Sequence, residues 1–202
     1  MDDDASLVAA VLAGNVPAFR QLVERHQGLV FTFARNLLRS PSDAEDIAQE
    51  TFLAAYRHLA TFDTRRARFR TWLLTIARNE ALTRLRRTPP PTSAGNLAEA
   101  PSGDAEPHVG LHHAELWNAL DEALDHLPLE QRTAFLLAEI QELPHAEIAE
   151  IESVEVGTIK SRVSRAKERL RALLRAYQPE RSGHAGTPAP AVPKADLPRR
   201  DP

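Results

Sequence analysis

Apolar residues recur along this chain at the spacing of amphipathic α-helices, and no stretch alternates with the period of a β-strand. The first apolar stripe ends at Gly14 and consists of Leu7, Val8, Val11 and Leu12. A longer stripe over 19–38 follows Pro17, and proline is well tolerated in the first turn of a helix. The pattern therefore predicts one short and one long helix at the start of the chain.

The next two helices are predicted from a capping signal and a loop. Ser42 followed by Glu45 forms a capping-box pattern, which predicts a helix that begins at about 43. Apolar residues lie on two sides of this helix, so we expect it to pack on more than one neighbour. The loop FDTRRARF, residues 62–69, then separates it from a helix predicted over 71–86.

Proline-rich segments divide the chain into two folded blocks, 5–87 and 111–177. Residues 88–110 contain five Pro and three Gly and are predicted to be a linker. Residues 178–202 contain six Pro and are predicted to be a disordered tail. In the second block, helices are expected over 111–126, from Pro128, from Pro144 to about Ile151, and from about 155 to 176. The predicted fold is all-α, with two small helical bundles joined by a flexible Pro-rich linker.

The last predicted helix has two faces that suit different surroundings. One arc of about 100° carries Val156, Ile159, Val163, Ala166, Leu170, Leu173 and Leu174. On the opposite side, the small residues Gly157 and Ser161 would let the helix approach a surface closely, and cations flank them on both sides. Together with the short helix HAEIAEI and a three-residue turn, this predicts a helix-turn-helix with its second helix in a DNA major groove. An ordinary amphipathic helix would explain the apolar stripe, but not the small residues between flanking cations.

The charge is unevenly distributed, although the formal net charge of the 202 residues is only −3. Residues 65–87 contain eight Arg and one Glu, and residues 156–175 contain seven Lys or Arg and one Glu. Two basic blocks in an acidic chain suggest two docking places for a polyanion, although solvated arginine-rich helix faces would look the same. The chain has no cysteine, an acidic N-terminus and no apolar run near the roughly 20 residues of a membrane helix. We therefore expect a soluble cytoplasmic protein without membrane insertion.

The most specific motifs of the chain are three long segments, DAEDIAQETFLAAYRHLATFD (43–63), FRTWLLTIARNEALTRLRR (69–87) and LPLEQRTAFLLAEIQELPHAEIAEIESVEVGTIKSRVSRAKERL (127–170). Together they resemble the extracytoplasmic-function (ECF, group IV) sigma factors of the sigma-70 family. The resemblance implies that 5–87 is region 2, which binds core RNA polymerase and recognises and melts the −10 element. It implies that 111–177 is region 4, whose helix-turn-helix recognises the −35 element. It also implies an anti-sigma factor as a partner.

The resemblance places the polymerase contact on the helix over 46–59. The expected contact residues are Asp46, Gln49, Glu50, Phe52, Leu53 and Tyr56. A mixed acidic and apolar face is poorly suited to DNA and suitable for a protein partner. Favourable interaction of acidic residues with the helix N-terminus would explain part of the same pattern.

The resemblance also assigns both DNA contacts. Single-stranded −10 bases are expected to bind where aromatics alternate with cations, at Phe62, Arg65, Arg66, Arg68, Phe69, Arg70 and Asn79. Phe62 and Phe69 would serve equally well as core anchors of the loop, and Trp72 is expected to pack inside its bundle. The duplex −35 contact is expected at Gly157, Thr158, Lys160, Ser161, Arg162, Ser164 and Arg165.

The turn of the helix-turn-helix departs from the family pattern. This chain has Glu152 and Ser153 in the turn IESVEV, where the family usually has Leu-Gly. If Ser153 adopts a positive φ, it costs about 1 kcal/mol relative to glycine. Pro144 stands where a Ser or Thr often caps the short helix, and its missing N–H is harmless in a first turn.

The sequence offers no catalytic constellation, and we expect neither a metal nor a cofactor. The adjacent His112 and His113 point in different directions on a helix, and no cysteine or clustered carboxylate completes a metal site. Two other classes of protein remain as alternatives. A helix-turn-helix regulator that acts without polymerase would not need the aromatic and arginine segment at 62–72, and an interaction module would not need the helix-turn-helix.

Overall fold

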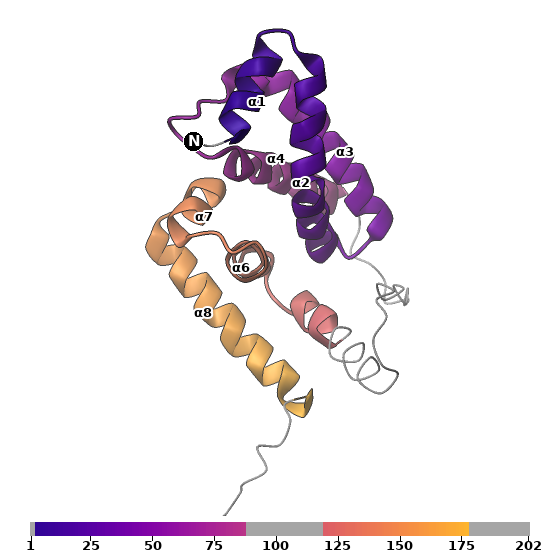
Figure 1. Cartoon of the computed structure of the whole chain (residues 1–202). Coiled ribbons are helices and arrows are strands. Elements are labelled where there is room, and N and C mark those ends of the chain that lie inside the picture. Colours follow the sequence, from indigo (N-terminus) through magenta and orange to yellow (C-terminus); the bar gives the residue numbers. More distant parts are fainter. Residues whose placement is uncertain (1–2, 88–118, 178–202) are drawn as a thin grey trace, which may run out of the picture.

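The structure of the chain is a computed structural model that describes residues 3–87 and 119–177 (Figure 1). The predicted linker and tail lie outside these residues, as does the first half of the helix predicted over 111–126. The first block contains α1 (Asp3–Leu12), α2 (Val16–Leu38), α3 (Pro41–His58) and α4 (Phe69–Arg87), with a 3-10 turn, η1 (Leu59–Thr61), after α3. The described residues contain helices and no strands, as predicted.

Helices α2, α3 and α4 enclose the core of the first block. α3 packs against both α2 and α4, which confirms the prediction that its two apolar stripes meet two neighbours. The largest fully buried side chains here are Leu22, Phe33, Leu37, Ile47, Leu59, Phe69, Leu73 and Leu74. α1 closes one side of α2, and Gly14, at φ 99°, makes the turn between them.

Helix α3 begins two residues before its predicted start at 43. Ser40 is the capping residue, because its Oγ accepts a hydrogen bond from the Asp43 backbone N–H at 3.2 Å. Pro41 occupies the first turn, where the fixed φ of proline favours the helix and its missing N–H has no cost. The prediction that Ser42 caps this helix was therefore wrong, and the Ser42 hydroxyl instead lies 3.1 Å from that of Ser40.

The second block consists of three helices that follow a helical segment over 119–125. α6 (Leu129–Phe135) starts after Pro128 and continues into a π-helical turn, η2 (Leu136–Ile140). α7 (His145–Glu152) and α8 (Val156–Leu173) are separated by a short turn at the place where the sequence predicts a helix-turn-helix, and a 3-10 turn, η3 (Leu174–Tyr177), follows.

The apolar stripe of α8 is shorter than predicted. Its buried residues are Ile159, Val163, Ala166 and Leu170, which pack against α6 and α7. Val156 and Leu173 are exposed instead of buried. They are the first and last residues of α8, so they lie outside the stretch that the neighbouring helices cover.

The two blocks pack directly against each other. α7 lies against α4, and η2 contacts α2 (Figure 1). Buried apolar residues of both blocks belong to one continuous cluster. The two bundles therefore share part of their apolar core in this arrangement.

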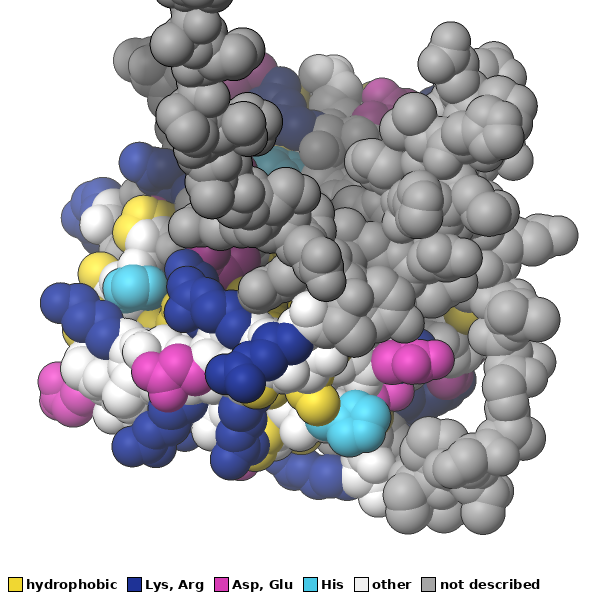
Figure 2. All heavy atoms as spheres, turned by 90° about the horizontal axis from the view of Figure 1, so that it is seen from below, with side chains coloured by type: hydrophobic (Ala, Val, Ile, Leu, Met, Phe, Trp, Pro, Cys, Tyr) yellow, Lys and Arg dark blue, Asp and Glu magenta, His cyan; other side chains and the backbone are white. Residues whose placement is uncertain are grey.

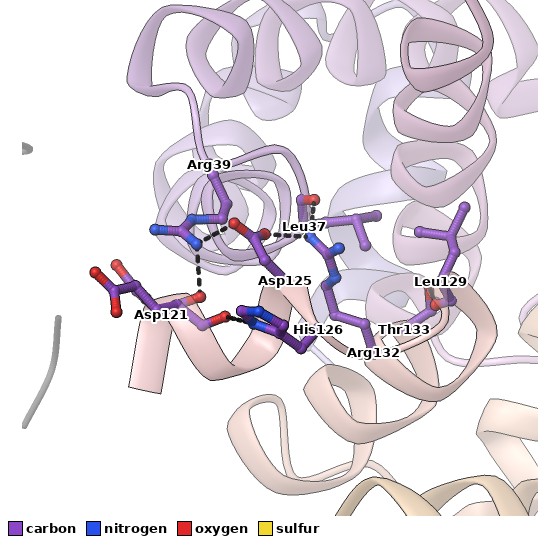
Figure 3. A network of polar contacts seen from close by, with 9 residues as sticks. Leu37, Arg39, Asp121, Asp125, His126, Leu129, Arg132 and Thr133 are labelled. Atoms are coloured by element: carbon purple, nitrogen blue, oxygen red, sulfur yellow. Dashed lines mark hydrogen bonds and ion pairs between the residues drawn. The ribbon is translucent and has the colours of Figure 1, made fainter. Parts of the chain in front are cut away.

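A polar network at the edge of this contact ties the second block to the end of α2 (Figure 3). Arg132 of α6 donates through Nη1 to the Leu37 carbonyl at 3.2 Å and to Asp125 Oδ1 at 3.1 Å. Arg39 donates to the other oxygen of Asp125 and, at 2.7 Å, to the backbone carbonyl of Asp121. Burial lowers the pKa of Arg132, and the carboxylate of Asp125 opposes that shift.

We expect Asp125→Ala to lower the free energy of unfolding by about 1 kcal/mol, because both arginines lose their carboxylate partner. Asp121→Ala is the matched control, since Asp121 accepts from Arg39 through its backbone carbonyl, which the substitution keeps. Urea denaturation of the two variants and the parent chain measures the difference. Equal losses in both variants would show that the Asp125 side chain is not part of a stabilising network.

Candidate nucleic-acid interface

The outward face of α8 carries the cations and small residues that were predicted for a −35 contact. Gly157, Lys160, Ser164 and Arg165 are exposed, and Thr158, Ser161 and Arg162 are half-buried. A Cβ added at Gly157 would meet no atom within 4 Å, so this glycine leaves open space on the outer side of the helix. Seen from below, Lys and Arg side chains gather on the part of the surface that described residues form, with some Asp and Glu side chains between them (Figure 2).

Two basic residues of α8 are held by glutamates of the same block. Arg162 forms an ion pair through Nη1 with Oε2 of Glu152, the last residue of α7. Lys167 pairs with Glu139 of η2 at 2.8 Å. Among the described residues, the exposed cations of α8 that have no ion-pair partner are Lys160, Arg165, Arg169 and Arg171. Lys160 and Arg165 are the two of these that were predicted to contact the −35 element.

The turn between α7 and α8 has the left-handed residue that the sequence suggested. Ser153 has φ 55° and ψ 46°, and its N–H donates to the Glu150 carbonyl at 3.2 Å. The Val154 N–H reaches back to the Ala149 carbonyl at 3.0 Å. These bonds end α7 and allow the chain to start α8 three residues later, so serine adopts here the backbone conformation usual for glycine.

The loop before α4 is held by a cluster of aromatic rings. Ring centroids are 5.6 Å apart for Phe62 and Phe69, 5.1 Å for Phe62 and Trp72, and 5.8 Å for Phe69 and Trp72. Phe69 is only 2% exposed, whereas Phe62 and Trp72 are half-buried. Phe69 is thus a core anchor of the loop, as the alternative interpretation had it, and its ring cannot stack on a base while it is buried.

The arginines of this loop remain accessible. Arg65, Arg66 and Arg68 are exposed on the segment between η1 and α4. The Asp63 carboxylate accepts from the Arg65 backbone N–H at 2.9 Å and pairs with its guanidinium, which shapes the turn. The hydrogen bond from the Arg65 side chain lowers the pKa of Asp63.

Helix α4 presents its predicted −10 residues in two different settings. Asn79 is exposed. Near the start of α4, Thr71 donates to Glu147 Oε2 of α7 at 2.5 Å, and Arg70 lies 3.9 Å from the same oxygen. In this arrangement Glu147 of α7 is therefore engaged with the polar groups of Thr71 and Arg70 at the start of α4.

Five of the six residues predicted to bind polymerase form one exposed stripe on α3. Exposed positions at helical spacing are Asp46, Gln49, Glu50, Leu53 and Tyr56. Phe52 is buried, because it lies about 100° around the helix from Leu53 and faces the bundle interior. Phe52 is therefore a core residue and does not belong to the exposed face.

Two buried polar pairs were missed by sequence reasoning. His26 of α2 lies 2.9 Å from Asp4 of α1, and its ring packs on Phe69 at 5.3 Å, so α1 supports the base of the aromatic loop. The other pair is Glu152 with Arg162. Glu152 follows Ile148 by four residues, so it continues the buried face of α7, and this spacing was the available signal.

Other kinds of site find little support in the residues that the structure describes. Among them, no group of three or more His, Cys, Asp or Glu side chains could hold a metal ion. No helix within 3–87 or 119–177 is both long and apolar enough to cross a membrane.

Comparison with known families identifies both blocks. Residues 22–88 match the family described as Sigma-70 region 2, and residues 117–170 match Sigma-70, region 4. The chain is 33% identical to the ECF RNA polymerase sigma factor SigW of Bacillus subtilis, over 83% of this chain and 95% of the relative. It is 37% identical to the ECF sigma factor SigM of Mycobacterium tuberculosis, over 85% of this chain and 84% of the relative.

Solved structures show the same architecture. The sigma factor RpoE of Bartonella quintana, in complex with the anti-sigma factor NepR, aligns with a TM-score of 0.65 and 27% identity. That alignment covers 79% of this chain and 98% of the RpoE chain. CnrH, in complex with the cytosolic domain of CnrY, aligns with a TM-score of 0.66 and 29% identity over 87% of this chain and 99% of CnrH.

The two region matches lie in family order, and the relatives are matched over most of their length. This chain therefore belongs to the ECF sigma factors of the sigma-70 family, which direct RNA polymerase to promoters and are initiation factors rather than enzymes.

Proposed function

We propose that α8 binds the −35 element as duplex DNA in the major groove. The observation that carries this proposal is the pairing of open space at Gly157 with exposed cations at Lys160 and Arg165. A major groove about 12 Å wide admits a helix, and its N-terminal residues reach the base edges. The cations farther along α8 would contact phosphates, which contributes affinity without reading sequence.

For the −10 element, we propose that the loop after η1 and the exposed side of α4 bind the melted strand. Arg65, Arg66 and Arg68 supply positive charge, and the half-buried rings of Phe62 and Trp72 lie beside them. Phe69 takes part only as the anchor beneath these rings. Because Glu147 bonds to Thr71, a strand can reach the start of α4 only after α7 has moved away.

Core polymerase is proposed to bind the exposed stripe of α3. Leu53 is 55% exposed and Tyr56 is also exposed, and the acidic Asp46 and Glu50 lie on the same side of the helix. An apolar centre with a polar rim is the usual anatomy of a protein interface. The Tyr56 ring is held edge-on by Phe19 of α2 at 5.0 Å, so it is oriented before any partner binds.

An anti-sigma factor is proposed as a further partner. One of the two aligned structures is a complex of the sigma factor RpoE with the anti-sigma factor NepR, and the other is a complex of CnrH with the cytosolic domain of CnrY. A cytoplasmic location, where polymerase and promoter DNA are found, is part of the same proposal.

We expect Arg165→Glu to reduce −35-dependent transcription about tenfold or more, because an exposed cation in the groove becomes an anion. The measurement is run-off transcription by core polymerase plus this protein, on a promoter selected from a random-sequence library. Arg171→Glu is the matched control, since it makes the same charge change on an exposed residue near the other end of α8. If the two variants lose the same activity, the effect is one of general charge and not of −35 recognition.

Leu53→Asp is expected to abolish co-purification with core polymerase and to leave the melting temperature unchanged, because Leu53 is on the surface. Leu12→Asp is the matched control, with 53% exposure on α1, outside the α3 stripe. Retained polymerase binding by Leu53→Asp would remove this stripe from the interface. Loss of binding by both variants would show that the effect is not specific to α3.

A further inference from the structure

Glu152 is an acidic residue in an apolar position. It is the last residue of α7, and its side chain is 0% exposed. One carboxylate oxygen, Oε2, accepts from Nη1 of Arg162, and the other, Oε1, has no hydrogen-bond partner among the described residues. A buried carboxylate with one unsatisfied oxygen is costly, so its presence calls for a reason other than packing.

The charges around Glu152 come from three elements. Arg162 of α8 and Arg78 of α4 favour the ionised carboxylate, and Glu130 of α6 opposes it. Burial outweighs the two arginines and raises the pKa of Glu152. An apolar side chain of similar size would therefore suit the stability of the fold at least as well.

Within the described part of the chain, Arg162 is the one residue whose side chain bonds to Glu152. The bond uses Nη1, and a guanidinium has five N–H donors in a rigid plane, so four donors remain. The Arg162 side chain is 23% exposed, so part of it reaches the surface of α8. A carboxylate that holds one edge of a guanidinium restricts its rotamers and leaves the other edge for a ligand.

We propose that Glu152 is a positioning residue that fixes the Arg162 guanidinium for contact with the −35 duplex. Glu152 does not touch DNA itself, and it acts through Arg162 alone. This inference rests on the proposed −35 role of α8. It also gives a reason for the buried carboxylate, which lowers the stability of the fold: Glu152 orients an arginine that is proposed to bind DNA.

The test compares promoter discrimination, defined as run-off transcription from a promoter with its −35 element divided by that from one with this element scrambled. The variants are Glu152→Leu, Glu152→Gln, Arg162→Ala and the double variant Glu152→Leu/Arg162→Ala, each as the full chain with core polymerase. We expect Glu152→Leu to lower discrimination about fivefold or more, as for loss of one ordered arginine contact. Glu152→Gln keeps an oxygen acceptor and is expected to retain part of it. The double variant should be no worse than Arg162→Ala alone.

The outcomes separate this inference from the function on which it rests. If Arg162→Ala keeps full discrimination, Arg162 does not contact the −35 element. The proposed −35 role of Arg162 and the positioning role of Glu152 are then both overturned. If Arg162→Ala loses discrimination and Glu152→Leu does not, the −35 contact stands and the positioning role is overturned. Increased discrimination in Glu152→Leu would also overturn it, because Glu152 would then hold Arg162 away from DNA.

Thermal stability distinguishes positioning from a structural role. The folded chain binds a proton at Glu152 more tightly than the unfolded chain, so the parent loses stability as pH rises through the raised pKa. Glutamine does not titrate. We therefore expect Glu152→Gln to have a higher melting temperature than the parent at neutral pH. The difference in melting temperature should decrease as pH falls toward 4.5, the ordinary pKa of a glutamate carboxyl. A lower melting temperature at neutral pH in both Glu152 variants, together with lost discrimination, would make Glu152 a structural residue and overturn the proposal.

Discussion

The placement of α7 between α4 and α8 is the constraint on which the rest of the structure depends. This helix has only eight residues, and its buried side chains Ile148, Ala149 and Ile151 form part of the cluster that runs through both bundles. α7 contacts α8 on one side and α4 on the other. It therefore sets the orientation of the helix proposed to face DNA and, in the same arrangement, covers the start of the helix proposed to hold the −10 strand.

The polar residues of α7 follow from this double contact. Glu147 meets Thr71 and Arg70 of α4, whereas Glu152 meets Arg162 of α8. A short acidic helix between two arginine-rich helices reduces the repulsion that their like charges would otherwise cause. Glu147 engages Arg70, a cation that a nucleic acid could bind, so the closed arrangement and nucleic-acid binding compete for that part of the basic surface.

Periodicity and turn residues predicted most of the fold, because an apolar stripe at helical spacing must be buried whatever covers it. The helices and the two-sided packing of α3 were predicted in this way, whereas the positive φ of Ser153 was suggested only by comparison of the turn with the family pattern. The start of α3 was misplaced, since Ser40 with Pro41 competes with the equally plausible signal at Ser42. Phe52 and Phe69 were assigned to binding surfaces. The residue type alone does not reveal whether an aromatic ring in a functional segment faces a partner or the core.

The sequence by itself determined the local structure, the uneven charge and the family, because these depend on residue types and their spacing along the chain. Only the tertiary structure decided which side chains are available and which are engaged. It brought Glu147 to Thr71 across 76 residues and joined Asp125 to Arg39 across 86. Such pairs depend on how helices far apart in the chain pack together. A glutamate that looks like ordinary helix surface in the sequence can therefore be buried against an arginine in the folded protein.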